Sequence, residues 1–305
     1  MLGLFLLTLR ELRARKVVIG LFLVATVVWV AFTFALQLDV VDGTLAGARL
    51  FGQEAVDGSV DPNAPLLDEE GNVILNADGE PRTARDDMPP FGDTMLESVV
   101  FGAQAFVAGA AYWVGILLAL FATGGLVASL TERGVVDVLL TKPLSRSAVL
   151  AGRLLAVMAV MLVLLVYLFG AVWLVMSIKS GLWAPGFLLA IPVVFGMFVV
   201  VYGVVTLVGV WSGSGPLSFI VTLGVLFVSL ILAIPELAVQ VDATWRPLVT
   251  GAYWALPNFG GVGTQVVPQL ATGAAVGSPW LLGSSLAFGA ACYGLAFFLF
   301  SRTDF

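Results

Sequence analysis

Long apolar runs alternate with shorter polar segments along the whole chain. Six runs are long enough to cross the ~30 Å hydrocarbon core of a bilayer, which takes ~20 mainly apolar residues in a helix. They cover about 17–38, 99–130, 148–178, 187–211, 217–235 and 280–300. Backbone groups cannot stay unpaired in lipid, and the strands of a membrane barrel would alternate over only ~10 residues. The pattern therefore predicts an all-α membrane protein with six transmembrane helices.

Composition points the same way and excludes several classes of function. Of the 305 residues, 60% are hydrophobic and 11% are charged, whereas soluble domains have ~45–50% and ~25%. The chain has no histidine and a single cysteine, Cys292. An internal disulfide, a Cys/His metal site and histidine-based catalysis are therefore excluded. We expect no enzymatic activity and no cofactor in this chain.

The distribution of charge predicts the orientation. Six spans place both termini on one side, and nine of the fourteen Lys and Arg residues fall on that side. Because cations concentrate in cytoplasmic loops, we expect both termini in the cytosol and the chain in the plasma or inner membrane. Sixteen of the twenty acidic residues fall on the other side. The net charge of −6 thus reflects the external segments.

Residues 1–16 predict an interfacial elbow helix ahead of the first span. Leu2, Phe5 and Leu9 recur at helical spacing, and four cations follow at positions 10, 13, 15 and 16. Such a helix lies in the cytoplasmic interface with its cations near anionic lipid headgroups. The alternative is that this segment simply extends the first span.

The external segment 39–97 is rich in Asp, Glu, Gly and Pro and predicts a small extracytoplasmic loop domain. Its stretch GNVILNADGEPR has a short β-type run before Asp78-Gly79, which is typical of a hairpin. We expect a solvated acidic loop. Calcium binding is an alternative, although the acids do not follow the regular calcium-loop spacing. The loop is also a candidate contact surface for an extracytoplasmic protein.

The last external segment, 236–279, is only half polar. Trp245, Tyr253 and Trp254 are residues of the kind that gather at membrane interfaces. We expect re-entrant-like short helices here, broken at Pro257 and Gly260. The spans on either side belong to a transmembrane domain that covers 98–305.

The most informative segment is 131–146, TERGVVDVLLTKPLSR, between the second and third spans. It is too charged to enter lipid, yet its valines and leucines recur at helical spacing. Lys142-Pro143 ends the helix, because proline disfavours helix in the residue before it. Ser145 is a suitable N-cap for the helix that follows. The pattern predicts a short amphipathic helix tied at both ends to membrane helices.

This segment resembles the cytoplasmic segment of permeases of the ABC-two superfamily, which have the type V exporter fold. The resemblance rests on Glu132, Gly134, Leu140, Pro143 and Ser145-Arg146, followed by Gly152-Arg153. The N-terminal LRELRARK is similar to the family's elbow helix. LPNF and the C-terminal FSRTDF resemble the branch that includes the permease of the nitrous oxide reductase maturation system. The external loop 39–97 is longer than in many members.

The resemblance implies a coupling helix that fits a groove on a separate cytoplasmic ATPase. The chain has no G-x-x-x-x-G-K-[ST] motif, so ATP and Mg²⁺ would be bound by that partner. The expected contact residues are Glu132, Arg133, Gly134, Val135, Val136, Asp137, Leu139, Leu140, Lys142, Pro143, Ser145 and Arg146. The resemblance also implies pairing with a second permease chain, identical or related. The predicted function is the permease subunit of an ATP-driven transporter, most simply an exporter.

Other readings of the sequence stay open. The 131–146 segment is also compatible with an ordinary amphipathic loop. The whole chain is also compatible with a membrane anchor of a larger complex, or with a secondary transporter that has no ATPase. Buried charges would favour a secondary transporter, and the spans hold almost none. Nothing in the sequence indicates nucleic-acid binding.

Polar side chains inside the spans offer few candidates for a substrate path. They are Gln104, Tyr112, Tyr167, Tyr202 and Thr206. Small residues recur four positions apart at 285–289, 290–294 and 209–213. The spacing either predicts close helix contacts or reflects only the high glycine content of the chain. The substrate-binding residues are not identified by these patterns.

Overall fold

The computed structural model describes residues 17–41, 44–57, 64–68, 72–76, 79–83, 94–128, 146–234 and 244–302. Within these residues, six helices are long and apolar enough to cross a membrane. They cover Val18–Ala35, Met95–Leu126, Ser147–Ser180, Pro185–Ser212, Gly215–Leu232 and Trp280–Arg302. The predicted all-α membrane fold is confirmed. The elbow helix expected at 1–16 lies outside the described residues.

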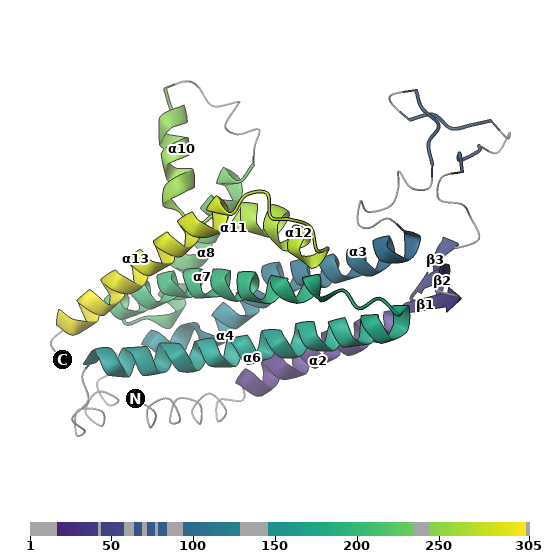
Figure 1. The fold of residues 1–305 in the computed structure, drawn as a ribbon. Helices are drawn as coiled ribbons and strands as arrows, with labels where there is room; N and C mark the ends of the chain where they lie inside the picture. Colours follow the sequence, from purple (N-terminus) through teal and green to yellow (C-terminus); the bar gives the residue numbers. More distant parts are fainter. Residues whose placement is uncertain are drawn as a thin grey trace.

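The spans form a bundle in which α7 (Ala190–Ser212) lies between α6 (Arg146–Ser180) and α13 (Trp280–Arg302) (Figure 1). The first span is α2 (Val17–Ala35) and the fifth is α8 (Gly215–Leu232). The second span consists of α3 (Met95–Ala110), the π-helical segment η2 (Ala111–Gly115) and α4 (Ile116–Ala128). A 3-10 turn, η4 (Pro185–Leu189), precedes α7.

The surface of the bundle is apolar where lipid would surround it. Phe106, Phe121, Phe227 and Ile220 are each more than 60% exposed, although all four lie in the middle of membrane-spanning helices. The interior is closely packed around α7, with Phe198 and Tyr202 fully buried. An exposed apolar surface around a packed interior is stable in hydrocarbon and unstable in water.

Glycines set the contact between α7 and α13. A Cβ at Gly289 would lie 3.0 Å from the Cα of Val200, and one at Gly203 would lie 3.3 Å from the Cβ of Cys292. The close helix contact predicted at 285–289 is therefore present. Of the other two pairs, Gly294 has open space where a Cβ would lie, and Gly213 ends α7 with φ +65°. That left-handed conformation favours glycine at helix ends.

Three strands follow α2 directly: β1 (Leu36–Val41), β2 (Thr44–Leu50) and β3 (Gln53–Asp57). They form an antiparallel sheet in the order β1-β2-β3 at one end of the bundle (Figure 1). The turn between β2 and β3 has positive φ at Phe51 and Gly52, as the tight hairpin turns of antiparallel sheets require. Sequence analysis did not predict this sheet, and it ended the first span at residue 38, whereas the helix ends at Ala35.

The stretch where a hairpin was predicted contains short antiparallel pairings, Leu67 with Val73 and Leu75 with Pro81. The Asn76 side chain accepts a hydrogen bond from the Glu80 N–H. The next helix, α3, begins with a capping box in which Thr94 and Glu97 each bond the other's backbone N–H. This cap fixes where the external chain enters the second span.

The segment between α8 and α13 holds α10 (Arg246–Ala255), α11 (Phe259–Gly261), the π-helical η5 (Val262–Val266) and α12 (Val267–Ala271). The chain breaks around Pro257, as predicted, but the break predicted at Gly260 is wrong. Gly260 is helical, and a Cβ there would lie 2.5 Å from the Cβ of Ala233. This glycine allows close packing on the end of α8.

Candidate functional site

The predicted coupling segment joins α4 to α6. Its residues from Glu132 to Ser145 lie outside the described residues, and the structure describes only Arg146, as the first residue of α6. The two helices that flank the segment are described over Ile116–Ala128 and Arg146–Ser180. The site is therefore built from these supports: the last turns of α4, the first turns of α6 and the elements that contact them. We call this region the α4–α6 end, and the opposite end, which carries β1–β3, the sheet end.

Arg153 ties α6 to α4. Its side chain is only 7% exposed, and its Nη1 donates a hydrogen bond to the carbonyl oxygen of Leu126. Leu126 lies near the end of the described part of α4, so this hydrogen bond reaches from α6 across to the neighbouring helix. Arg153 thus joins the two helices that bracket residues 129–145.

Tyr202 ties α4 to α7. It is fully buried, and its hydroxyl donates to the carbonyl oxygen of Thr123 at 3.3 Å. The Thr123 hydroxyl in turn donates to Ala119, and the Thr206 hydroxyl donates to the Tyr202 carbonyl. The final turns of α4 are therefore held by hydrogen bonds from α6 on one side and α7 on the other.

The start of α8 completes the α4–α6 end. A Cβ at Gly215 would lie 2.9 Å from the Cα of Gly125 on α4, so the two backbones are in direct contact. Ser214 caps α8 by accepting from the Leu217 N–H. Consequently, displacement of the α4 end requires movement of α6, α7 and α8, because packed interiors transmit strain.

The sheet end has a cation in a comparable position. Lys179 Nζ donates to the carbonyl oxygens of Thr33 (2.5 Å) and Leu36 (2.8 Å), where α2 passes into β1. Deeper along the same pair of helices, the Tyr167 hydroxyl lies 2.9 Å from the Thr26 hydroxyl and accepts from Trp29 Nε1 at 3.0 Å. Thus α2 is bonded to α6 at two levels.

A second buried polar group surrounds Asn258, which we call the Asn258 cluster. The backbone N–H of Asn258 donates to Ser285 Oγ, and its side-chain oxygen accepts from the Gly261 N–H. Ser229 Oγ bonds the Pro257 carbonyl and the Phe259 N–H. The Tyr112 hydroxyl donates to the Phe259 carbonyl at 2.7 Å, and the two rings stack. These bonds fix the break at Pro257 inside the bundle.

The predicted path residues are mostly used for helix contacts. Tyr112, Tyr167 and Tyr202 bond other helices or segments, and Thr206 bonds its own helix. Gln104 is 1% exposed, and its Oε1 has no hydrogen-bond partner in the part of the chain that the structure describes. In that same part, no group of three or more His, Cys, Asp or Glu side chains could hold a metal ion.

Sequence reasoning missed the structural roles of two cations. Arg153 entered only as part of a Gly-Arg pair, and Lys179 only as an external charge. The signal for both was present: each is a lone cation near one end of a long apolar run, where such residues bond carbonyls or reach the interface.

Comparison with known proteins identifies a family. A family model described as ABC-2 family transporter protein matches residues 9–305. Searches of curated proteins and of solved structures found no match. The matched region includes the six spans, the undescribed 129–145 segment and the segments 39–97 and 236–279. It therefore covers both ends of the bundle.

Proposed function

The chain belongs to the ABC-2 family of membrane transporter proteins, and from this premise we propose that it is the permease subunit of an ATP-driven exporter. ATP and Mg²⁺ are bound by a separate cytoplasmic ATPase, because this chain has no phosphate-loop motif. The observation that carries the proposal is the family match over almost the whole chain. The resemblance of Glu132–Arg146 to a coupling helix supports it.

The proposed orientation places both termini and the α4–α6 end in the cytosol, and the sheet end outside. The excess of Lys and Arg on the side of the termini supports this. The membrane is the plasma or inner membrane, and two permease chains, identical or related, pair around the substrate path. The acidic external region is available to an extracytoplasmic protein.

In this mechanism the ATPase pushes on the coupling helix, and the α4–α6 end spreads the push. Val135, Val136, Leu139 and Leu140 supply the apolar contact with the ATPase, and the charged residues around them supply weaker rim pairs. Arg153 prevents α4 and α6 from moving apart. The energy comes from the preference of ATP for the closed ATPase dimer, and the permease transmits that bias.

α6 is suited to carry the movement across the membrane. Its 35 residues span about 52 Å at 1.5 Å per residue, which exceeds the ~30 Å hydrocarbon core. It is bonded to α4 near its first turns and to α2 near its last turn. A rotation or shift at the coupling helix would therefore reach the base of the external sheet.

The test is co-purification of the ATPase from the native cell membrane with the tagged full-length chain. The double variant Leu139→Asp, Leu140→Asp should abolish it, because two buried contacts become charged. The matched control is Leu67→Asp, Leu75→Asp, which adds the same charge at two external leucines that are each 58% exposed. The control should retain the ATPase.

Normal recovery of the ATPase with the Leu139→Asp, Leu140→Asp variant would remove the coupling assignment. If the unmodified chain recovers no phosphate-loop protein, the reading as a secondary transporter replaces the proposal. If the unmodified chain recovers a stable external protein and no ATPase, the reading as a membrane anchor replaces the proposal.

A further inference from the structure

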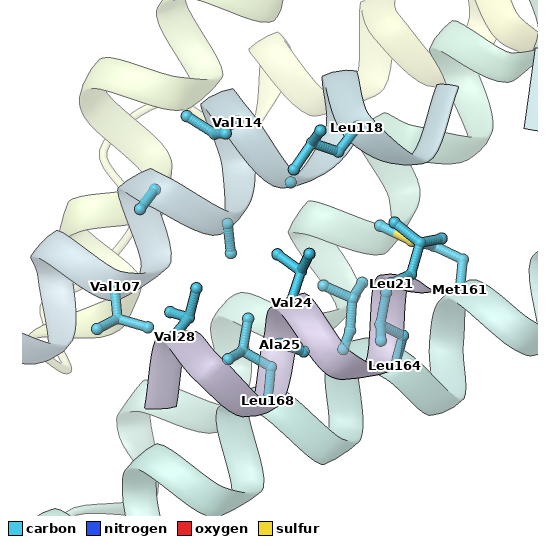
Figure 2. A pocket seen from close by; sticks show the side chains of 14 residues that line it. Leu21, Val24, Ala25, Val28, Val107, Val114, Leu118, Met161, Leu164 and Leu168 are labelled. Atoms are coloured by element: carbon cyan, nitrogen blue, oxygen red, sulfur yellow. The ribbon is translucent and has the colours of Figure 1, made fainter. Parts of the chain in front are cut away.

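An apolar groove runs along the bundle between α2, the second span and α6 (Figure 2). All fourteen residues that line it are apolar, and its volume is about 210 Å³. One wall is α2, from Leu21 to Val28, the opposite wall runs from Val107 to Leu118, and α6 contributes Met161 to Leu168.

The groove has a buried floor and an exposed rim. Ala25, Met161 and Leu165 are at most 6% exposed, whereas Val24, Val114 and Leu118 are 44%, 57% and 40% exposed. The rim residues come from α2 on one side and from η2 and α4 on the other, as Figure 2 shows. The groove therefore opens sideways, toward the surroundings of the bundle at the depth of the membrane.

The fold holds this groove open. The hydrogen bonds of Tyr167 and Lys179 hold α2 against α6, so α2 is not free to close on the second span. On the facing wall, η2 presents the small residues Ala111 and Gly115 to the groove. On its other face, η2 is held by the stacking of Tyr112 on Phe259. π-helical turns of this kind are frequent at functional sites.

We propose that the groove binds one acyl chain of a membrane phospholipid. An apolar recess left empty destabilises the protein in proportion to its volume, and hydrocarbon chains are the material that lies against its opening. The walls span about 10 Å on α2 and about 16 Å on the second span at 1.5 Å per residue. The longer of the two is close to the thickness of one leaflet, which is half of the ~30 Å core.

A helix from a second copy of the chain does not fit inside the groove. A helix with its side chains is about 10–12 Å wide, whereas the groove holds about 210 Å³ over a length of two to three helical turns. A second copy would only cover the rim. The acyl-chain proposal goes beyond the proposed function and does not depend on an ATPase partner.

The experiment uses the full chain reconstituted in phosphatidylcholine vesicles that contain phosphatidylcholine with a diazirine in the middle of one acyl chain. After irradiation, adducts are mapped by peptide mass spectrometry. We expect several-fold more adducts on peptides from the groove walls than on α13, whose Leu286 and Leu295 are 52% and 54% exposed and lie outside the groove.

Two variants fill the groove, and one serves as a matched control. In Gly115→Leu the added Cβ meets only the Ala111 Cβ, at 3.9 Å, so the backbone need not move. Ala110→Leu is the second filling variant, used if the first does not fold. Gly20→Leu adds the same side chain to α2 in open space outside the groove. Filling should remove the groove adducts, and the control should retain them.

Equal labelling of the groove and α13 would overturn the proposal, as would unchanged groove labelling in a folded filling variant. The third possible outcome is that a second copy of the chain covers the groove. A disulfide between two chains carrying Val24→Cys, in a Cys292→Ser background, would show that protein covers the groove and would also overturn the proposal.

Discussion

The two ends of α6 carry the same kind of contact in different surroundings. At the α4–α6 end, Arg153 is almost completely buried and donates to a carbonyl in the last turn of α4. At the sheet end, Lys179 is half-buried and donates to two carbonyls where α2 passes into β1. In both cases a cation on α6 donates to backbone carbonyl oxygens of a neighbouring helix or of the strand that follows it.

The difference lies in what else is held at each end. The α4 end is also bonded by Tyr202 and contacted by Gly215, so that four helices meet there. At the base of the sheet, Lys179 joins α6 to α2 and β1, and β2 also contacts α3. α6 is therefore bonded to its neighbours near both ends, and the end with the buried arginine is the one where the proposed function places the ATPase. The predictions below separate the roles of the two ends.

Replacing Arg153 should have the largest effect. Arg153→Met leaves the Leu126 carbonyl without its charged donor, and we expect the free energy of unfolding in detergent to fall by about 2–3 kcal/mol. The ATPase rate of the purified complex should also fall several-fold, because α4 and α6 are no longer joined. Arg153→Lys, which keeps the charge but not the planar guanidinium, should recover part of both.

If Arg153→Met leaves both the unfolding free energy and the ATPase rate unchanged, the α4–α6 end is not the stiff region described here. If only stability falls, Arg153 has a structural role without transmitting movement.

Crowding the contact between α4 and α8 should come next. In Gly215→Leu the new Cβ would lie 2.9 Å from the backbone of Gly125, and overpacking of this kind costs about 1–3 kcal/mol. Gly224→Leu on the same helix has open space at its Cβ and serves as the control. Thermal unfolding of both variants measures the difference, and equal midpoints would contradict the close contact.

Replacing Lys179 should have a smaller and more local effect. Lys179→Met removes two hydrogen bonds at a half-buried position, and we expect a loss of about 1 kcal/mol in unfolding free energy. The external segment should be cut faster by protease while the ATPase rate of the complex stays at the unmodified level. A fall in that rate as large as in Arg153→Met would abolish the contrast between the two ends.

Removing one hydroxyl should have the smallest effect. Tyr167→Phe eliminates the bonds to Thr26 and Trp29, and hydrogen bonds between membrane helices average about 0.6 kcal/mol. Denaturant unfolding measures the loss in unfolding free energy of Tyr167→Phe. The control is Tyr253→Phe, which lies in α10 outside the spans. If Tyr167→Phe lowers the unfolding free energy more than Lys179→Met does, α2 is held mainly in the middle of the membrane.

The spans were predictable because hydrophobic length alone decides them. The lipid environment requires helices, so Val17, Arg146 and Trp280 begin helices close to where the apolar runs begin. The sheet was not predictable in the same way. The apolar run of the first span continues to Leu38, yet the chain becomes a strand at Leu36 because pairing with β2 outweighs local helix preference.

The supports of the site were only partly predictable. The sequence marks Arg153 as an isolated charge, but which carbonyl it meets depends on how α4 packs against α6, because the partners are 27 positions apart in the sequence. The role of each glycine also depends on the tertiary arrangement. Gly213 and Gly289 belong to similar sequence patterns, yet one ends a helix and the other contacts α7. Only the tertiary arrangement separates the two roles.

The central claim is that the segment between α4 and α6 lies in the cytosol, where a separate ATPase can act on it. Ser145→Cys in a Cys292→Ser background, treated with a membrane-impermeant maleimide, tests this directly. Leu67→Cys in the external segment is the control and should be labelled in intact cells. The account predicts that Ser145→Cys is labelled only after the cells are permeabilised. Labelling of Ser145→Cys in intact cells would place the segment on the outer face and contradict the account.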